Sequence, residues 1–244
     1  MKNRVSILGV PVDCVTLTEA RDRVLAMSVS GAHHVMTPNP EMLTEANRNP
    51  AFKTLLQSSD LNIPDGAGLL WAARRAGETL PERVTGVDLL SAVTSVVGCP
   101  SVFLLGAAEG VAEAAADHLR KKNPSLHIAG TYSGSPHENE EQLIVAKINA
   151  SKAAILFVAY GAPKQDMWIR KNLPKMPSVH VAMGIGGAFD FLAGKRTRAP
   201  QVLRYFGLEW LWRLVQEPSR IGRIFTAVVV FPYLVLTQSR LAPQ

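Results

Sequence analysis

Five short turns rich in glycine, proline and polar side chains carry the residue types in this sequence that are best suited to chemistry. They cover residues 37–41, 65–68, 104–110, 160–168 and 184–190. Each turn follows an apolar run typical of a buried strand, and in an open parallel sheet the strand ends border the crevice in which ligands bind. One such turn is a weak sign of a site, but five at successive strand ends indicate a shared one.

Asp65 is the side chain in these turns that is best suited to acid–base chemistry, because its carboxylate can accept a proton from a hydroxyl group. An equally matched alternative is that Asp65 caps the next helix and Gly66 supplies the turn. The first turn adds Thr37 and Asn39, which neighbouring prolines hold stiffly as hydrogen-bonding groups. Taken alone, this turn favours the alternative that Asn39 is a helix cap.

The remaining turns are suited to phosphate or nucleotide. Gly106 allows phosphate oxygens to approach backbone amides, although tight packing of a strand on a helix needs the same glycine. Lys164 and Gln165 begin a helix that faces the crevice, although Lys164 also fits an ordinary solvated lysine. The last turn resembles a dinucleotide-binding loop, but the acidic residue about 20 positions further on, Glu209, lies in a tryptophan-rich stretch. This turn contributes Gly184, Gly186, Gly187 and Asp190.

Apolar, strand-like runs alternate with helical patterns over the first 194 residues. The expected strands cover residues 5–10, 33–36, 61–63, 101–105, 127–129, 153–159 and 179–183. The expected helices lie between them, at residues 17–27, 41–47, 67–76, 87–97, 109–122, 138–149 and 164–171. This alternation predicts an α/β fold, a Rossmann-like parallel sheet with helices on both faces.

The character of the chain changes after residue 194. Residues 1–194 contain 18 Lys and Arg and 18 Asp and Glu, so residues 195–244 carry the whole net charge of +6. This tail has a helical stretch with Trp210 and Trp212, followed by an apolar stretch that Pro232 interrupts. We therefore expect an α/β catalytic domain at 1–194 and a helical, membrane-associating appendage at 195–244, with an apolar stretch too short to span a bilayer.

Several absences in the sequence narrow the function. The sequence has no Asp-x-Asp pair and no His/Cys spacing of a metal site, so we predict no metal and no cofactor. Cationic side chains and helix N-termini would then meet the charge of a diphosphate. Cys14 and Cys99 lie in apolar stretches, and the N-terminus lacks the pattern of a signal peptide, which together are typical of the cytosol.

Six ordered motifs resemble the WecG/TagA/CpsF glycosyltransferases, and most of all the TagA-type N-acetylmannosamine transferases. They lie at 37–41, 61–68, 80–88, 161–168, 184–190 and, as a two-part motif, 198–201 with 207–213. The resemblance implies an inverting, metal-independent transfer of N-acetylmannosamine, or its uronic acid, from a UDP-sugar. The implied acceptor is N-acetylglucosamine linked through pyrophosphate to undecaprenol, and the implied product is a β-1,4 disaccharide lipid for teichoic acid or a surface polysaccharide.

The resemblance also assigns residues. Asp65 is expected to be the general base, with Thr37 and Asn39 beside it, while Arg83 and Gln165 contact the substrates. Inversion needs only one carboxylate, whereas a retaining hydrolase needs a second. Arginines of the appendage are expected to close the site and meet the lipid pyrophosphate: Arg213, Arg220 and Arg223. The residues expected to bind substrate or nucleotide are Gly66, Gly106, Lys164, Gly184, Gly186, Gly187 and Asp190.

Two other functions compete with this one. A nicotinamide-dependent Rossmann oxidoreductase predicts a glycine fingerprint near the first strand, which residues 9–13 lack. A non-enzymatic protein that binds a membrane surface or nucleic acid is supported only by the basic tail, which lacks the basic and aromatic interleaving expected for nucleic acid. We therefore expect a UDP-sugar donor, an undecaprenyl-pyrophosphate acceptor and an anionic membrane surface as partners, and no nucleic acid. The expected location is the cytoplasmic face of the bacterial membrane, as a peripheral protein, and a homo-oligomer is left open.

Overall fold

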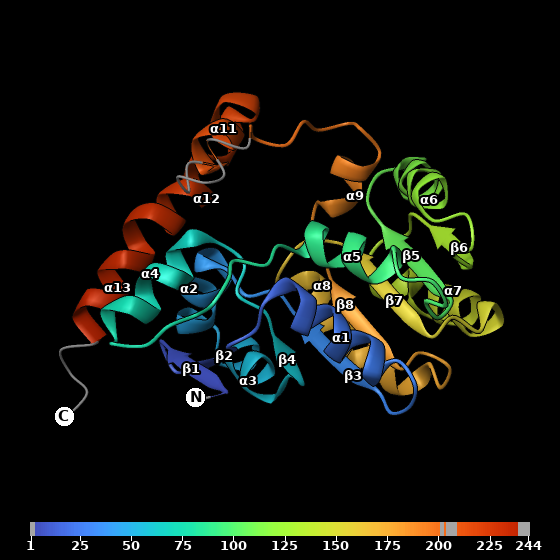
Figure 1. Ribbon diagram of the computed structural model, residues 1–244, viewed down its shortest axis with the longest axis horizontal. Coiled ribbons are helices and arrows are strands. Elements are labelled where there is room, and N and C mark those ends of the chain that lie inside the picture. The colour runs from blue at the N-terminus through green and yellow to red at the C-terminus, as the bar shows by residue number, and fades with distance from the viewer. Residues whose placement is uncertain (1–2, 201–202, 204–208, 239–244) are drawn as a thin grey trace.

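The computed structural model describes residues 3–200, 203 and 209–238 of the 244-residue chain. A six-stranded, fully parallel sheet with helices on both faces lies beside a second group of helices and a two-stranded hairpin (Figure 1). The strand order in the sheet is β4-β3-β8-β7-β5-β6. The predicted α/β, Rossmann-like fold is therefore confirmed.

The strands of the sheet are short, and the central ones are buried on both faces. Alternate residues of β5 show this: Leu104 belongs to the core on one face, whereas Phe103 and Leu105 belong to the core on the other. Parallel pairing aligns the strand ends, and Val35 of β3 lies opposite both Leu61 and Met183. The strands are β3 (His33–Met36), β4 (Leu61–Asn62), β5 (Val102–Gly106), β6 (Ile128–Tyr132), β7 (Ile155–Ala159) and β8 (Val181–Gly184).

Two layers of helices cover this sheet. The first core lies between the sheet and α1 (Leu17–Met27), α5 (Gly86–Thr94), α6 (Val111–Lys122) and α9 (Ala188–Leu192). The second lies between the sheet and α7 (Glu138–Ser151), α8 (Lys164–Asn172) and the 3-10 helix Leu173–Lys175. Apolar strands sandwiched in this way explain why the strand runs in the sequence are almost continuously hydrophobic.

The N-terminal strand was predicted wrongly. Residues 5–10 were expected to be one strand of the sheet, but β1 (Arg4–Ile7) and β2 (Val10–Asp13) form a separate antiparallel hairpin. Leu8 and Gly9 both have positive φ, which fits the two-residue turns that join twisted antiparallel strands. The turn therefore falls inside what looks like one apolar run.

A third core joins this hairpin to helices from both ends of the chain. The hairpin packs with α2 (Pro40–Arg48), α3 (Pro50–Ser58) and α4 (Ala67–Arg75), and α3 was not expected from the sequence. Phe231 and Val235, near the C-terminus, complete the same core. In Figure 1 the last helices accordingly run alongside α4 and α2.

The last helices follow α11 (Glu209–Gln216). A 3-10 turn (Pro218–Arg220), α12 (Ile221–Phe225), a π-helical turn (Thr226–Val230) and α13 (Phe231–Gln238) form one continuous helical run, here called the C-terminal helical segment. α11 covers the second half of the helical stretch expected at 200–217, whereas residues 201, 202 and 204–208 of that stretch lie outside the described residues. The domain boundary predicted at residue 194, just after α9, stays a prediction.

The C-terminal helical segment is longer than the sequence indicated. It contains 21 residues, Pro218–Gln238, and a stretch of 18 of them has a mean hydropathy of 1.6. By length and composition alone, the segment is sufficient to cross a membrane. The expectation of a stretch too short to span was wrong, because it treated Pro232 as a break. The backbone stays helical through Pro232, directly after the π-helical turn, and local π geometry is one way in which a helix accommodates proline.

Candidate active site

A cavity opens where the carboxyl ends of β3, β4, β7 and β8 lie side by side. We call it the sheet-end cavity. Ligand sites of open α/β sheets lie in this position. Eight of the predicted site residues line it: Thr37, Asn39, Asp65, Gln165, Gly186, Gly187, Arg220 and Arg223. The prediction that turns from successive strands meet at one site therefore holds for four of the five turns, all but 104–110.

A second pocket, here called the helix-side pocket, adjoins the cavity. It shares Asn39, Asp65, Arg220 and Arg223 with the sheet-end cavity. Predicted residues Gly66 and Arg83 line it, together with Trp210 and apolar side chains of the C-terminal helical segment: Ile224, Ala227 and Val228. Asp65 therefore stands at the junction of a largely polar cavity and a pocket that combines arginines with apolar surface.

Two turns hold Asp65 near Thr37 by packing directly on each other. A Cβ atom at Gly68 would lie 2.7 Å from Pro40 Cγ, and one at Gly66 would lie 3.3 Å from Pro40 Cδ. Gly66 also has a φ of +112°, which favours glycine. The backbone N–H of Asp65 donates to the carbonyl oxygen of Pro38 at 2.9 Å. Pro40 of the first motif therefore packs directly on Gly66 and Gly68 of the second.

The alternative that a polar residue of the turn is simply a helix cap is correct for Asn39 and wrong for Asp65. Asn39 is the N-cap of α2, and its Oδ1 accepts the N–H of Met42 at 2.9 Å, so the capping interpretation is correct for Asn39. The N-cap of α4 is Gly66, so Asp65 lies one residue before the cap and the capping interpretation is wrong there. Thr37 is nearly buried, and its hydroxyl donates to the carbonyl oxygen of Gly184 at 3.4 Å.

Gln165 joins two turns of the cavity. Its Oε1 accepts the backbone N–H groups of Gly161 and Gly186, each at 3.0 Å, so one side chain fixes the end of β7 to the end of β8. Gln165 is only 3% exposed, so the role that the structure shows for its side chain is to position these two turns. The next residue, Asp166, is fully buried 3.6 Å from Nε2 of His34 and so links α8 to β3 beneath the cavity.

Four predicted binding residues do not line either pocket described here. Gly106 allows close packing of neighbouring strands, because an added Cβ would lie 3.0 Å from the backbone of Ala159. Gly184 backs onto Gln165 and Asp166 in the same way, at 2.5 Å. Lys164 is exposed at the start of α8, which fits the solvated alternative.

The fourth, Asp190, is in a salt bridge with Arg196 at 3.5 Å. The side chain of Arg213 lies outside the described residues. Among the residues that the structure describes, no three His, Cys, Asp or Glu side chains are grouped so that they can hold a metal ion.

Comparison with known proteins identifies the family. The sequence matches the family described as "Glycosyl transferase WecG/TagA/CpsF family" over residues 5–244. The chain belongs to the WecG/TagA/CpsF glycosyltransferases. The resemblance carried by the six motifs is thereby confirmed.

Relatives with more specific names cover the whole length of this glycosyltransferase. They are N-acetylglucosaminyldiphosphoundecaprenol N-acetyl-beta-D-mannosaminyltransferases of Staphylococcus aureus, from strains MW2, NCTC 8325 / PS 47 and COL. Each is 29% identical to this chain over 242 residues, which cover 97% of this chain and 94% of the relative.

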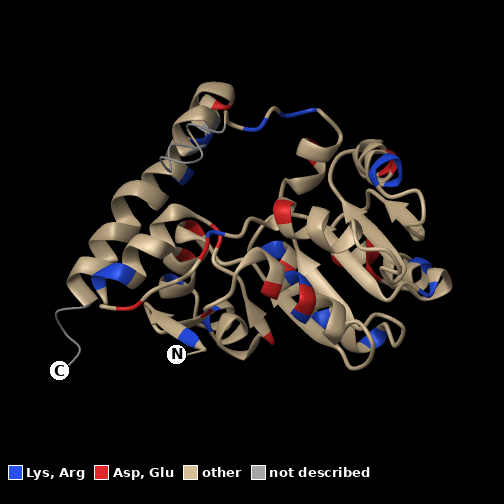
Figure 2. Cartoon of the chain, viewed as in Figure 1, with Lys and Arg blue, Asp and Glu red and all other residues tan. Residues whose placement is uncertain are grey.

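Arginines of the transferase surround the sheet-end cavity, and each of the following is paired with a carboxylate. Arg223 lies 2.6 Å from Glu41. Arg196 Nη2 lies 2.7 Å from Oε1 of Glu217, while Arg220 pairs with Oε2 of the same carboxylate. Arg196 is a residue that sequence reasoning missed. The only signal available was its place in the basic run that follows Gly194, which Figure 2 shows as Lys and Arg along the segment between α9 and α11.

A second ion pair fastens the beginning of the appendage to the transferase body. Arg198 donates to both carboxylate oxygens of Asp88, at 2.6 and 3.0 Å, and the Thr85 hydroxyl donates to the same carboxylate at 2.6 Å. Burial raises the pKa of Asp88, but the hydrogen bonds from Arg198 and Thr85 outweigh burial and hold that pKa below its ordinary value. Nearby, the indole N–H of Trp212 donates to the carbonyl oxygen of Thr197 at 3.1 Å.

Proposed function

We propose that this transferase moves N-acetylmannosamine, or its uronic acid, from a UDP-sugar to N-acetylglucosamine linked through pyrophosphate to undecaprenol. The names of the Staphylococcus aureus relatives support the sugar and the lipid-linked acceptor. The position of Asp65 at the junction of the two pockets is the observation that carries the proposal. A sugar transferase needs a base between its donor and acceptor sites, and Asp65 occupies that place.

The proposed step is a single displacement with inversion. Asp65 accepts the proton of the acceptor hydroxyl, and the hydroxyl oxygen forms a bond to the anomeric carbon of the donor sugar. The bond from that carbon to the diphosphate breaks on the opposite face, and UDP leaves with the electron pair. Arginines at the cavity wall meet the charge that develops on the diphosphate.

The helix-side pocket suits the lipid-linked acceptor. Arg83 and Arg223 supply cations for its pyrophosphate. Ala227 and Val228 supply apolar surface for the first isoprene units, since they belong to the part of the pocket formed by the C-terminal helical segment. The sheet-end cavity is then left for the UDP-sugar, against the turns at Gly186 and Gly187.

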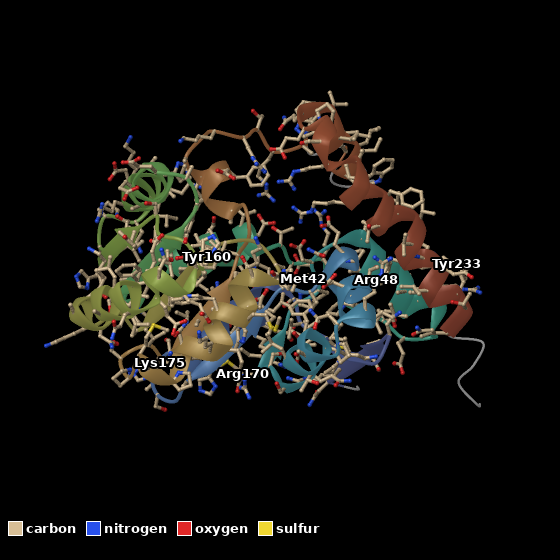
Figure 3. All side chains as sticks on the ribbon, turned by 180° about the vertical axis from the view of Figure 1, so that it is seen from behind. Met42, Arg48, Tyr160, Arg170, Lys175 and Tyr233 are labelled. Atoms are coloured by element: carbon tan, nitrogen blue, oxygen red, sulfur yellow. The ribbon has the colours of Figure 1, made fainter. Side chains whose placement is uncertain are left out.

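The C-terminal helical segment supports an attachment to the membrane surface on the cytoplasmic side. One side of the segment packs on the body, where Phe231 is fully buried. The other side exposes apolar side chains along the length of the segment, here called the apolar stripe: Ile221, Phe225, Val229, Tyr233 and Leu236. Tyr233 projects outward from this side in Figure 3. A helix held on the body by one face and apolar on the other suits the membrane interface, with the lipid pocket beside it.

A product assay tests the proposal. The purified enzyme is incubated with a synthetic lipid-pyrophosphate N-acetylglucosamine acceptor and, separately, with UDP-N-acetylmannosamine, its uronic acid and UDP-N-acetylglucosamine. Mass spectrometry is expected to show one added N-acetylmannosamine or uronic acid residue, and NMR is expected to show a β-1,4 linkage. Transfer of N-acetylglucosamine alone, or no transfer with any donor, would contradict the proposal.

A further inference from the structure

Two arginines from different parts of the transferase hold one carboxylate between them at the sheet-end cavity. Arg196 binds one oxygen of Glu217 at 2.7 Å, and Arg220 binds the other oxygen. All three side chains line the cavity. Each of the three is partly exposed, with between 23% and 31% of the side chain accessible, so none is locked into the core.

A phosphate group could take the place of the Glu217 carboxylate between these two arginines. Two guanidinium groups on opposite oxygens of one anion bind a carboxylate or a phosphate equally well in shape, but a diphosphate carries more charge. The charged residues that line the cavity are Asp65 and Glu217 against Arg196, Arg220 and Arg223. With Glu217 turned away, Asp65 would be the carboxylate left in that lining, while Arg196 would keep its pair with Asp190 and Arg223 its pair with Glu41. The cavity would then be more positive by one charge, which favours an anion.

Arg196 also lies at the wall of the cavity next to Gly187, where the donor is proposed to bind. Its Nη1 is 3.6 Å from the position that a Cβ atom would take at Gly187, so it borders the turn at the end of β8. Its backbone N–H donates to the carbonyl oxygen of Asp190 at 3.1 Å, which fixes the residue to the end of the sheet. Arg196 does not line the helix-side pocket, whereas Arg220 lines both pockets.

We propose that Arg196 and Arg220 bind the diphosphate of the nucleotide-sugar donor, and that Glu217 occupies this diphosphate site in the free enzyme. Diphosphate binding breaks both of its ion pairs with Glu217, and that carboxylate turns toward solvent. Arg196 is then a substrate-binding residue that steadies the leaving group, and Glu217 is an internal competitor for the same two cations. The proposal deepens the proposed function, on which it rests for the donor being a nucleoside diphosphate sugar.

Opposite effects of two substitutions test this competition. Calorimetry gives the Kd of UDP and UMP for the wild type and for the variants Arg196→Gln and Glu217→Gln, with Arg120→Gln on the exposed side of α6 as a control. Arg196→Gln is expected to raise the Kd of UDP roughly 10- to 100-fold, as loss of a charged hydrogen bond does. The fold-increase in the Kd of UMP is expected to be about ten times smaller, because UMP lacks the second phosphate. Glu217→Gln is expected to tighten UDP binding by about 3- to 10-fold, because a competing charge is removed.

A structural role would give a different pattern. If the Arg196–Glu217 pair only held the appendage in place, both variants would weaken UDP binding, and that result would overturn the proposal. Unchanged UDP binding in Arg196→Gln would also overturn it. Geranyl diphosphate separates the two sources of a diphosphate: if Arg196→Gln weakens binding of this prenyl compound and leaves UDP unchanged, the site belongs to the acceptor and the donor assignment is wrong.

The same measurements separate this proposal from the proposed function. Failure of the wild type to bind UDP would contradict the nucleotide donor itself. Tight UDP binding by the wild type, without the opposite shifts in the two variants, would leave the proposed transferase reaction standing and remove only the diphosphate site at Arg196.

Discussion

Asp65 lies between two pockets of different character, and its part in transfer can be measured separately from folding. Asp65→Asn keeps the shape of the side chain but cannot accept a proton, so turnover is expected to fall roughly 10²- to 10⁴-fold while the Kd of UDP stays near the wild-type value. The measurement is steady-state transfer to the lipid acceptor together with UDP calorimetry. Asp22→Asn, on the exposed side of α1, is the matched control. Turnover of Asp65→Asn near that of the control would remove Asp65 as the base.

At the same scale, the sequence placed some residues well and others poorly. Thr37, Asn39 and Asp65 line the cavity as expected, because each lies within three residues of a strand end and parallel strands bring such residues to one edge. Gly106 ends β5 and Lys164 comes five residues after β7, yet the chain uses the first for tight packing and leaves the second in solvent. Position after a strand tells which end of the sheet a residue occupies, but not which way its side chain points.

Helix packing explains why the end of the chain matters for stability. Phe231 is fully buried in the core that also contains the hairpin, whereas Phe225, two turns earlier, is more than half exposed. Phe231→Ala is therefore expected to lower the free energy of unfolding by about 3–5 kcal/mol, through lost burial and a cavity. Phe225→Ala is the control and is expected to change it by less than about 0.5 kcal/mol. Urea unfolding followed by circular dichroism measures both, and equal effects would mean that the segment does not pack as described.

The salt bridge between Asp88 and Arg198 predicts a pH dependence with a defined sign. Because the folded-state pKa of Asp88 lies below the ordinary value of an aspartate, the bridge contributes stability that is fully present above that ordinary value. This contribution is lost as the pH falls through the lower folded-state pKa. The difference in unfolding free energy between wild type and Asp88→Asn is therefore expected to be constant from about pH 7 to 5 and to shrink below about pH 4.

Chemical unfolding at a series of pH values measures this difference. Arg120→Gln, which affects an exposed pair, is expected to show no such trend. A difference between wild type and Asp88→Asn that grows as the solution is acidified would contradict the lowered pKa.

The elements themselves were predictable to different extents. The strands and helices of the sheet follow the change of hydrophobic period along the sequence, so most were expected within a few residues. The hairpin was missed because its turn consists of Leu8 and Gly9, a pair that does not interrupt an apolar run. The C-terminal helical segment was underestimated because proline usually ends a helix, and no local pattern shows that a π-helical turn lies before Pro232.

For the whole molecule, attachment to the membrane is expected to depend on the apolar stripe more than on charge. Phe225→Glu combined with Val229→Glu is expected to prevent flotation with anionic liposomes, because both side chains are exposed on the stripe. Val29→Glu combined with Val97→Glu changes two valines on the body that are even more exposed and serves as the control. Flotation assays in low and high salt measure the effect, and salt alone is expected to weaken attachment only partly.

Two results would change this picture of attachment. Flotation of the stripe variant at the wild-type level would show that the stripe does not meet the membrane. Resistance of the wild type to extraction at alkaline pH would show that the C-terminal helical segment is embedded as an integral helix instead of lying at the surface.

Charge balance across the whole active site predicts independence from divalent metal ions. Arg196 and Arg220 are proposed to bind the donor diphosphate, and displacement of Glu217 makes the cavity more positive by one charge, so we expect the diphosphate to need no bridging cation. Transfer is therefore expected to proceed at its full rate in excess chelator. Loss of activity in chelator, with recovery on addition of magnesium or manganese, would show that a metal ion takes part.

The core shared by the hairpin and the C-terminal helical segment has a consequence for synthesis of the chain on the ribosome. Residues 5–12 leave the ribosome about 220 residues before Phe231 and Val235, which complete their core. At roughly 5–20 residues per second, the interval is about 10–45 s. During this interval the nascent chain exposes apolar surface on the hairpin, α2 and α4, so we expect it to depend on chaperones until Phe231 and Val235 have emerged. Pulse proteolysis of stalled chains that end before residue 218 is expected to cut near α4, and a cleavage pattern equal to that of the released protein would contradict this dependence.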